Sequence, residues 1–345
     1  MNETLNRTMP AVAYRQSLPA QDDESLVDVE LPVPQPGPHD LLVRVEAVAV
    51  NPVDYKVRQN SDPGGQPKVL GWDAAGTVVA VGDRVALFAA GDEVYYAGAI
   101  DRPGSNARFH VVDERIVGRK PTTLSFTEAA ALPLTSLTAW EGLFERLGLR
   151  RDDGRRETGT LLVTAAAGGV GAMVAQLARA FTDLTVVGTA SRPETGEFAR
   201  RMGVTHVVDH HHPLPQQVAR LAPDGLDHIF STAGTDRNLP AYADMLKPFG
   251  GLVAIDDFGP VEIGLLKSKS ISFHWELMFT RSLFRTPDMA TQHHILNQVA
   301  GLVDRGVLTT TATQDLGTVN AAHLREAHRI LESGRAIGKI TLTGF

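Results

Sequence analysis

The sequence predicts an α/β protein in which a doubly wound parallel sheet is joined to a second, β-rich domain. An apolar run, a glycine cluster and a helical pattern follow one another between Gly159 and Phe181. Strand-like and helix-like segments then alternate as far as Trp275, which is typical of a parallel sheet with helices on its faces. The first third of the chain shows short apolar runs separated by glycine and proline, which predicts the β-rich domain.

The N-terminal third is expected to open with a loose tail over residues 1–9. The segment 31–40 carries four prolines and a glycine, which indicates an extended connector. Asn51 to Asp54 interrupts the strand that follows it, and a mobile polar stretch is expected over 59–66. The predicted strands cover residues 11–14, 41–50, 76–81 and 84–88.

The middle of the chain is expected to alternate between the two kinds of element. A helical pattern over 126–147, interrupted by Pro133, precedes a charged loop over 152–158. Predicted strands cover 161–164, 184–189, 207–208, 226–231, 251–255 and 271–275, and predicted helices include 194–202, 218–221 and 238–246. The last third is expected to hold helices over 292–303 and 323–332 and strands over 308–311 and 337–342.

The glycine cluster indicates a dinucleotide site. Ala165, Gly168 and Gly171 form a variant of the G-x-G-x-x-G spacing between a predicted strand and a predicted helix. Glycines let the backbone approach a pyrophosphate, and a helix N-terminus offers free N–H groups. Close packing of strand and helix is the alternative use of such glycines. The uncharged segment 161–178 also has the length of a membrane span, but its central glycines and scarce Leu and Phe argue against that.

Composition narrows the class of protein. The chain has 345 residues, enough for two domains, and 43% hydrophobic with 21% charged residues describes a soluble globular protein. A net charge of −7 without a basic block makes nucleic acid an unexpected partner. The first twenty residues lack an apolar core segment, so no secretory signal and a cytosolic location are expected. Without cysteine there is no disulfide, no thiolate nucleophile and no Cys-ligated zinc.

The end of the second predicted strand of the sheet favours NADPH over NADH. NAD-binding sheets of this kind place an acidic residue there, which binds the ribose hydroxyls. This chain has Ser191 and Arg192 after Thr189, and neither Asp nor Glu. A hydroxyl and a guanidinium suit a 2′-phosphate. The alternative is that Arg192 is an exposed loop charge.

Taken together, these segments resemble the medium-chain dehydrogenase/reductase superfamily and, more narrowly, its zinc-independent quinone oxidoreductase branch, which includes zeta-crystallin. The resemblance covers nearly the whole chain. It rests on Asn51–Asp54 as N-P-x-D, Gly71–Gly76 as a G-x-D-x-x-G-like segment, Val81–Val94, Ala129–Ala139, the turn Ala165–Gly171 and the ending Gly338–Ile340.

The resemblance implies that no metal is bound. Zinc-dependent members have a Cys ligand at the position of Asn51 and a His ligand at that of Trp72, and their third ligand is a Cys. The adjacent histidines His210–His212 and His293–His294 do not by themselves present a tetrahedral set, and they are expected on the solvated surface.

The resemblance also implies an arrangement. Residues 1–124 and 287–345 would form a GroES-like catalytic domain, and residues 125–286 a Rossmann dinucleotide-binding domain, with the nicotinamide in the cleft between them. The strand 271–275 would pair with its mate in a second subunit, giving a homodimer.

Catalytic and cofactor residues follow from the same resemblance. Asn51 would donate a hydrogen bond to a substrate carbonyl, and Tyr55 would donate its hydroxyl or stack on a planar ring; a turn role for Asn51 and packing for Tyr55 are the alternatives. Asp54 is a candidate turn residue, and solvent is expected to supply the proton. The expected cofactor contacts are Thr135 (or a helix cap), Ala167, Gly168, Gly169, Val170, Gly171, Ser191, Arg192, Ser231, Thr232, Ala233, Gly234, Asp257, Phe258, Gly259 and Lys339, the last binding a phosphate or serving as a surface charge.

The expected function is metal-independent transfer of hydride from NADPH to an acceptor that is already electrophilic, a quinone or a conjugated enone or enal. Two alternatives remain: an NAD(P)-dependent alcohol dehydrogenase, and a non-catalytic NADPH-binding sensor.

Overall fold

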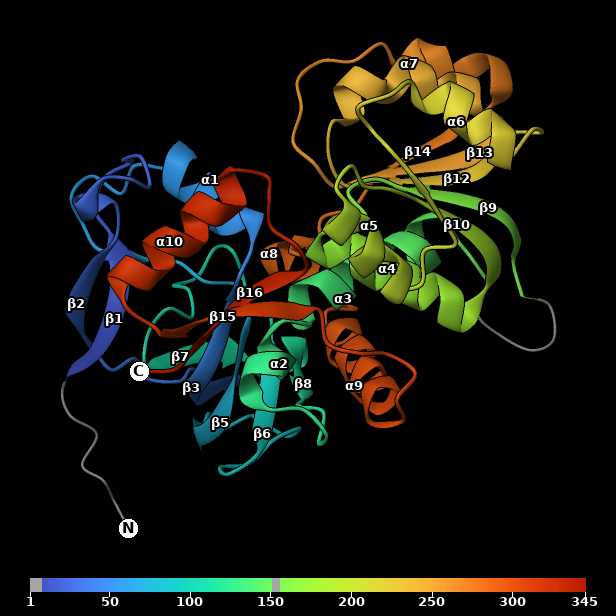
Figure 1. Ribbon diagram of the computed structural model, residues 1–345. Coiled ribbons are helices and arrows are strands. Elements are labelled where there is room, and N and C mark those ends of the chain that lie inside the picture. The colour runs from blue at the N-terminus through green and yellow to red at the C-terminus, as the bar shows by residue number, and fades with distance from the viewer. Residues whose placement is uncertain (1–7, 151–155) are drawn as a thin grey trace. The chain divides into compact units, whose positions relative to one another are not determined.

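The computed structural model describes residues 8–150 and 156–345, and the chain divides into two compact units. Unit 1 comprises the chain up to Leu134 together with Phe279–Phe345, and unit 2 comprises Thr135–Met278 (Figure 1). The first unit is β-rich and the second is α/β, as expected. Parts of the expected N-terminal tail and of the charged loop, residues 1–7 and 151–155, lie outside the described residues.

Unit 2 is built on a six-stranded, entirely parallel sheet. Its strand order is β11-β10-β9-β12-β13-β14, which reverses direction between β9 and β12 as in Rossmann folds. The strands are β9 (Thr158–Val163), β10 (Asp183–Thr189), β11 (His206–Val208), β12 (Leu226–Ser231), β13 (Leu246–Ala254) and β14 (Ser272–Trp275). The doubly wound sheet is therefore confirmed. β14 lies at its edge, and its pairing with a second subunit stays a prediction.

Helices cover both faces of this sheet because each carries one apolar stripe. Helices α6 and α7 pack on one face together with the 3-10 turn η4, and their buried side chains join those of β9, β12 and β13 in one core (Figure 1). The helical elements are α3 (Pro133–Trp140), the π-helical turn η3 (Glu141–Arg146), α4 (Gly169–Phe181), α5 (Pro193–Arg201), α6 (Leu214–Leu221), α7 (Thr235–Met245) and η4 (Ile263–Lys269).

Unit 1 contains two sheets. A three-stranded sheet has the order β2-β1-β4, and a seven-stranded sheet has the order β15-β16-β3-β5-β6-β8 with β7 paired to β3. Within them, only β15 and β16 pair in parallel. The strands are β1 (Thr8–Tyr14), β2 (Val27–Pro32), β3 (Asp40–Val50), β4 (Lys68–Val69), β5 (Ala74–Val81), β6 (Glu93–Tyr96), β7 (Phe109–Asp113), β8 (Val117–Arg119), β15 (Ala312–Thr318) and β16 (Lys339–Thr343).

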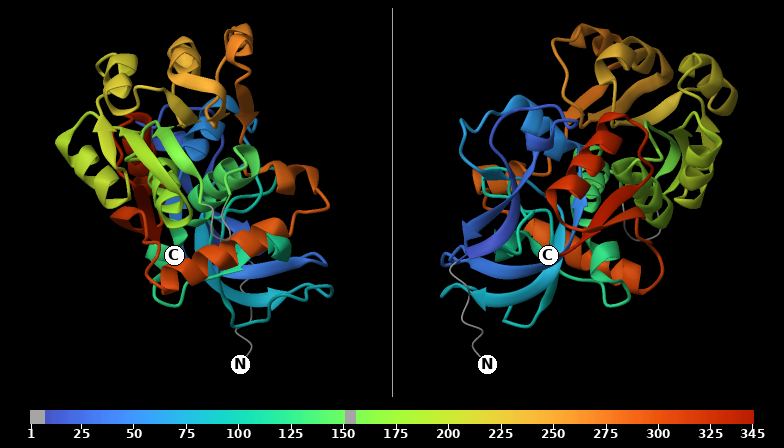
Figure 2. Two further views of the ribbon diagram at one scale, coloured as in Figure 1. Left: turned by 90° about the vertical axis from the view of Figure 1, so that its right-hand side faces the viewer. Right: turned by 60° about the vertical axis from the view of Figure 1, so that its left-hand side comes forward.

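The helices of unit 1 pack around the larger sheet. Helix α2 contacts β3, β5 and β16, so the chain crosses to unit 2 later than Leu124. Helix α9, the long orange helix in the left view of Figure 2, packs on β8. The helical elements are η1 (Asp23–Ser25), α1 (Pro52–Asn60), η2 (Glu114–Ile116), α2 (Phe126–Ala130), α8 (Thr280–Phe284), α9 (Thr291–Asp304) and α10 (Ala321–Glu332).

Two predicted strands of unit 1 are wrong. Residues 84–88 form a loop, because the backbone N–H groups of Ala86 and Leu87 donate to the Glu114 carboxylate at 2.9 and 2.7 Å instead of to a neighbouring strand. The strand expected over 308–311 lies at 312–318, a polar stretch that pairs with β16. The expected break at Asn51 is present, but it opens helix α1 with Pro52 in its first turn.

A buried arginine joins two helices of unit 1. The Arg58 side chain on α1 is completely buried and donates to the His328 ring at 3.2 Å and to Leu18 O and the Glu332 carboxylate. His328 and Glu332 belong to α10, so these contacts hold α1 and α10 together.

Within residues 8–150 and 156–345, no helix is both long and apolar enough to cross a membrane. The uncharged segment 161–178 is divided between β9, the glycine turn and α4.

Candidate functional site

The glycine turn of unit 2 has the geometry of a phosphate-binding turn. Helix α4 begins at Gly169, directly after β9 and the turn, and its N-cap Gly168 offers no side chain to the free N–H groups of the first helical turn. A Cβ on Gly171 would lie 2.6 Å from Ala165 O, so only glycine allows the turn to approach the helix this closely. Ala165 itself has a φ of 45°. Ala167 lies in the same turn, and Val170 lies in the first turn of α4.

The end of β10 is bonded to this turn. Thr189 Oγ1 accepts a hydrogen bond from Ala165 N at 2.9 Å, and Thr189 O accepts one from Ala166 N at 3.1 Å. Ser191 and Arg192, which follow Thr189 closely, are both half-buried. The Arg192 guanidinium forms a 3.0 Å ion pair with the exposed Glu194.

The reversal of strand order lies beside the same turn. Thr232 N donates to Thr164 Oγ1 at 2.7 Å, and Thr232 Oγ1 donates to Thr164 O at 2.7 Å, which ties the carboxyl ends of β12 and β9 together. Gly234 has a φ of 68° at the N-cap of α7, a conformation that favours glycine. Ligands of doubly wound sheets bind at this reversal.

Ser231 corrects the sequence analysis. Its hydroxyl is completely buried and interacts with the hydroxyls of Tyr242 at 3.2 Å and Thr235 at 2.8 Å. The Ser231 side chain therefore packs inside unit 2 and does not face a cofactor.

The loop after β13 lies at the same edge of the sheet. Asp257 and Gly259 are exposed, and the Phe258 ring stacks on Trp275 with centroids 4.6 Å apart. Sequence analysis missed the neighbouring Asp256, which accepts hydrogen bonds from Thr235 N at 3.0 Å and from the Thr235 hydroxyl, and so orders the start of α7. The signal in the sequence that could have found Asp256 is its place as a second acidic residue next to Asp257.

Thr135 lies in the first turn of α3 and is buried. It stands within the helix and not at its N-cap, so the helix-capping alternative does not hold. Its contact with the nicotinamide ribose stays a prediction.

In unit 1 three distant parts of the sequence meet in a buried polar cluster of Asn51, Asp73 and Lys339. Asn51 follows β3, Asp73 precedes β5, and Lys339 opens β16. Lys339 Nζ donates to Asn51 Oδ1 at 2.5 Å, to Asp73 Oδ2 at 2.9 Å and to Val50 O at 2.9 Å. Asn51 Nδ2 donates to Asp73 Oδ2 at 2.8 Å, and Leu134 N donates to Asp73 Oδ1 at 2.8 Å.

Lys339 is the second correction. It is 3% exposed, so it is not a surface charge, and the three donors of its ammonium are all used inside unit 1. Lys339 therefore has no donor left for a phosphate. Burial raises the pKa of Asp73 above its ordinary value, although the charge of Lys339 acts in the opposite direction.

Asp54 is a buried carboxyl group beside this cluster. Its Oδ2 accepts a hydrogen bond from Asn51 N at 2.6 Å, a contact that fits the expected turn role. Burial raises its pKa to about 7 and nearby Asp73 adds to this rise, against the opposing effects of the Asn51 hydrogen bond and the Lys339 charge. Sequence analysis quoted Asp54 and Asp73 as parts of motifs but assigned neither a place in a shared cluster.

The two remaining residues of interest in unit 1 lie on α1 and near β5. Tyr55 is half-buried on α1, and its hydroxyl has no hydrogen-bond partner among residues 8–150 and 156–345. Trp72 is 1% exposed, donates from Nε1 to Ala99 O at 3.2 Å and packs edge-on against Phe279. Trp72 is thus a core residue.

No group of three or more His, Asp or Glu side chains within the described part of the chain is placed to hold a metal ion. His210–His212 are exposed, as expected. The expectation is wrong for His293, which is buried and bonds through Nδ1 to Val117 O at 2.6 Å, because the apolar face of α9 packs on β8.

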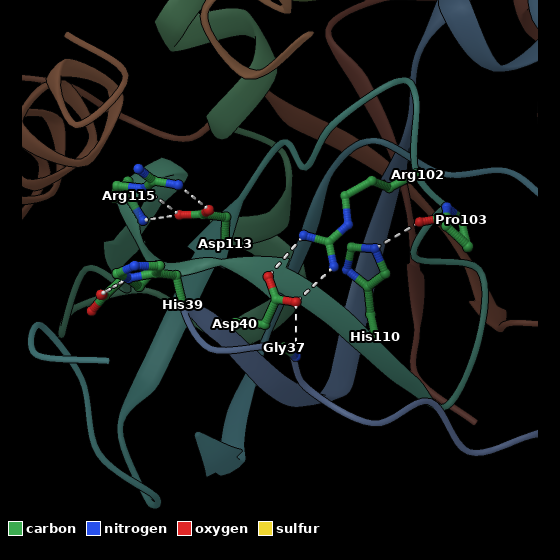
Figure 3. A network of polar contacts seen from close by, with 9 residues as sticks. Gly37, His39, Asp40, Arg102, Pro103, His110, Asp113 and Arg115 are labelled. Atoms are coloured by element: carbon green, nitrogen blue, oxygen red, sulfur yellow. Dashed lines mark hydrogen bonds and ion pairs between the residues drawn. The ribbon is translucent and has the colours of Figure 1, made fainter. Parts of the chain in front are cut away.

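A second polar network lies at the far end of β3 (Figure 3). Arg102 binds Asp40 through two hydrogen bonds of 2.8 and 3.0 Å, and Arg115 binds Asp113 through bonds of 2.9 and 2.7 Å. They border a hollow of about 480 Å³. Asp40 opens the 11-residue strand that ends before Asn51, so the two networks are about 35 Å apart along the strand. These paired charges hold loops and are separate from the cluster at Asn51.

Comparison with known proteins shows the family. Residues 37–134 match the alcohol dehydrogenase GroES-like domain, and residues 169–289 match the zinc-binding dehydrogenase family. A zinc-type alcohol dehydrogenase-like protein of Staphylococcus epidermidis is 36% identical over 336 residues, covering 97% of this chain and 99% of that protein. A quinone oxidoreductase of Pseudomonas aeruginosa is 31% identical over 323 residues, covering 89% and 92%.

Comparison with solved structures supports the same family. A Rhizobium etli protein, provisionally assigned as a zinc-dependent alcohol dehydrogenase, has 52% sequence identity and a TM-score of 0.93, over 98% of this chain and 99% of that one. The chain belongs to the medium-chain dehydrogenase/reductase superfamily. Within it, the chain is an oxidoreductase whose relatives include quinone oxidoreductases.

Proposed function

We propose that this protein is an NADPH-dependent reductase that delivers hydride to a quinone or a conjugated enone or enal without a metal ion. The observation that carries the proposal is the chemistry at the two zinc-ligand positions of the family. Asn51 and Trp72 stand there, and both are buried and hydrogen-bonded inside unit 1. An indole offers no lone pair to zinc, and the third family ligand, a cysteine, is absent from the sequence.

The residues of unit 2 fit a nicotinamide dinucleotide. The uncapped start of α4 and the close approach at Gly171 form a cradle for a pyrophosphate. Ser191 and Arg192 offer a hydroxyl and a guanidinium to a 2′-phosphate, and the loop holding Asp257, Phe258 and Gly259 lies at the same sheet edge. When bound, the dinucleotide supplies the hydride; a quinone that takes up this hydride and one proton from solvent becomes a hydroquinone.

Asn51 and Tyr55 would act on the acceptor. One hydrogen on Asn51 Nδ2 is donated to Asp73 Oδ2, and the second hydrogen on this nitrogen has no acceptor within residues 8–150 and 156–345. That hydrogen would bind the carbonyl oxygen and stabilise the negative charge that develops on it. Tyr55 would donate to the same oxygen or stack on the ring. Because a neutral amide polarises a carbonyl less than zinc does, acceptors with conjugated, electron-poor double bonds are favoured over plain ketones.

The test is a panel of quinones, enals, enones and simple alcohols, followed by the absorbance of NADPH. Turnover of quinones or enones is expected. Oxidation of simple alcohols by NADP⁺ without quinone reduction would support an alcohol dehydrogenase instead. Tight binding of NADPH without turnover of any acceptor would indicate a binding protein.

The choice of cofactor is tested separately. Arg192→Ala is expected to weaken NADPH binding about tenfold, the loss of one charge-assisted contact, and to leave NADH binding unchanged. Arg200→Ala, an exposed arginine further along α5, is the matched control. Equal effects of Arg192→Ala on both cofactors would reject the 2′-phosphate contact.

A further inference from the structure

We propose that Lys339 and Asp73 are positioning residues that fix the side-chain amide of Asn51 in one orientation, with its free N–H as the donor to the acceptor oxygen. This inference rests on the proposed function, because it concerns the group that would bind the acceptor. It adds to that function a residue, Lys339, that lies 288 positions away from Asn51 in the sequence.

The two contacts of the amide permit a single orientation. An ammonium can only donate hydrogen bonds, and an ionised carboxylate can only accept them. Lys339 Nζ lies 2.5 Å from one end of the Asn51 amide, and Asp73 Oδ2 lies 2.8 Å from the other. The end at Lys339 must be the oxygen, and the end at Asp73 must be the nitrogen. A flipped amide would place its NH₂ against the ammonium and its oxygen against the carboxylate.

The backbone anchors the same side chain. Lys339 also binds Val50 O, the carbonyl directly before Asn51, and Asn51 N donates to Asp54 Oδ2 at 2.6 Å. Asp73 is in turn held by Leu134 N. With the Asn51 backbone, its amide oxygen and one amide hydrogen all engaged, the second hydrogen has a fixed direction. Preorganised donors cost no reorientation when charge develops on the substrate.

The charge of Lys339 also strengthens the donor. A cation hydrogen-bonded to an amide oxygen draws electron density from the nitrogen, so its N–H groups donate more strongly. The titratable groups around this amide are Lys339, Asp73 and Asp54, and Lys339 is the cation among them. A buried cation would thus act on the acceptor through Asn51 without touching it.

The first experiment is a double-mutant cycle on quinone turnover. Lys339→Met is expected to lower kcat about tenfold and Asn51→Ala about a hundredfold, while NADPH affinity is unchanged in both. In the Asn51→Ala background, adding Lys339→Met is expected to change kcat less than twofold. Equal tenfold losses in both backgrounds would overturn the proposal, because a general structural role does not depend on Asn51.

The matched control is Lys120→Met. Lys120 is also a buried lysine of unit 1, and its Nζ binds two backbone carbonyls, Pro121 O and Leu124 O. It takes no part in the cluster, so its replacement is expected to leave kcat within twofold of the wild type.

The second experiment needs no turnover. The side-chain amide resonances of Asn51 are identified by their loss in Asn51→Ala and are compared by NMR in the wild type, Lys339→Met and Lys120→Met. A shift and faster hydrogen exchange are expected in Lys339→Met alone. Unchanged resonances would overturn the proposal even if quinones are reduced, whereas absent turnover with shifted resonances would reject the proposed function and keep the positioning role.

Lys339→Met leaves the Asp73 carboxylate buried without its cation, so this variant could fail to fold. A second variant, in which the cluster is neutral, keeps the test decisive in that case. Asp73→Asn/Lys339→Met removes both charges and retains an acceptor for Asn51 Nδ2. The same amide shift and loss of kcat are expected in it, and wild-type values would overturn the proposal.

Discussion

Replacing Asp54 by Asn would reveal the cost of ionising a buried carboxyl group in unit 1. Asp54 is 1% exposed, and burial raises its pKa from the ordinary 3.8 to about 7. Between about pH 4 and pH 7 the unfolded chain therefore releases this proton while the folded chain keeps it. The folded state binds more protons in this window, so the free energy of unfolding falls as pH rises.

The magnitude follows from the two pKa values. The two pKa values differ by about 3, and a difference of one pKa unit corresponds to about 1.4 kcal/mol. Ionisation of Asp54 therefore lowers the free energy of unfolding by about 4 kcal/mol between pH 4 and pH 7. Asn cannot ionise, and its amide oxygen can still accept the hydrogen bond from Asn51 N. The difference in the free energy of unfolding between Asp54→Asn and the wild type is therefore expected to change by about 4 kcal/mol in favour of the variant between pH 4 and pH 7.

The assay is urea unfolding at pH 4.5, 5.5, 6.5 and 7.5. Trp72, the tryptophan of unit 1, reports by fluorescence when Trp140 and Trp275 are replaced by Phe in both proteins. The control is Asp22→Asn, an exposed carboxylate that accepts from Glu24 N at 2.9 Å, whose effect is expected to be small at every pH. A stability difference for Asp54→Asn that is the same at all four pH values, or that grows toward acid, would refute the reasoning.

Two further substitutions test the glycine turn and the packing of unit 1. Gly171→Ala places a methyl group 2.6 Å from Ala165 O, so it is expected to shift the turn and abolish dinucleotide binding in a fluorescence titration; wild-type affinity would show that no close approach is needed. Arg58→Met removes a completely buried cation and is expected to cost about 3 kcal/mol in urea unfolding, against less than about 1 kcal/mol for Arg329→Met, an exposed pair on α10. Equal costs for the two would show that the buried pair between α1 and α10 adds no stability.

The strands of unit 2 and its helices α4, α5, α6 and α7 could be predicted because each one carries its own local signal, whereas η4 was not predicted. Its strands are short apolar runs bounded by glycine or polar residues, and its helices have one apolar stripe. Helix α1 was missed because it is polar, with no apolar stripe after Pro52, and its buried side chains are the ionisable groups of Asp54 and Arg58. Strand β15 was misplaced because its residues are polar and its position is decided by pairing with β16.

The candidate site likewise has a part that could be predicted from the sequence and a part that could not. Glycines, a strand and a helix start lie within a few residues of one another, so the glycine turn could be located without the fold. Ser231 and Lys339 were assigned by their places near a sheet edge and near the end of the chain. Whether a hydroxyl or an ammonium faces solvent depends on neighbours such as Tyr242 and Asp73, which are not adjacent in sequence.

By itself the sequence determined the two kinds of domain, the place of the glycine turn between a strand and a helix, and the absence of any cysteine ligand, because these depend on residue type and short-range spacing. Only the tertiary structure decided that Asn51, Asp73 and Lys339 share one buried cluster and that Asp54 holds its proton up to about pH 7. These properties are set by burial and by hydrogen bonds between residues that lie 22 to 288 positions apart in the sequence, so no local pattern encodes them.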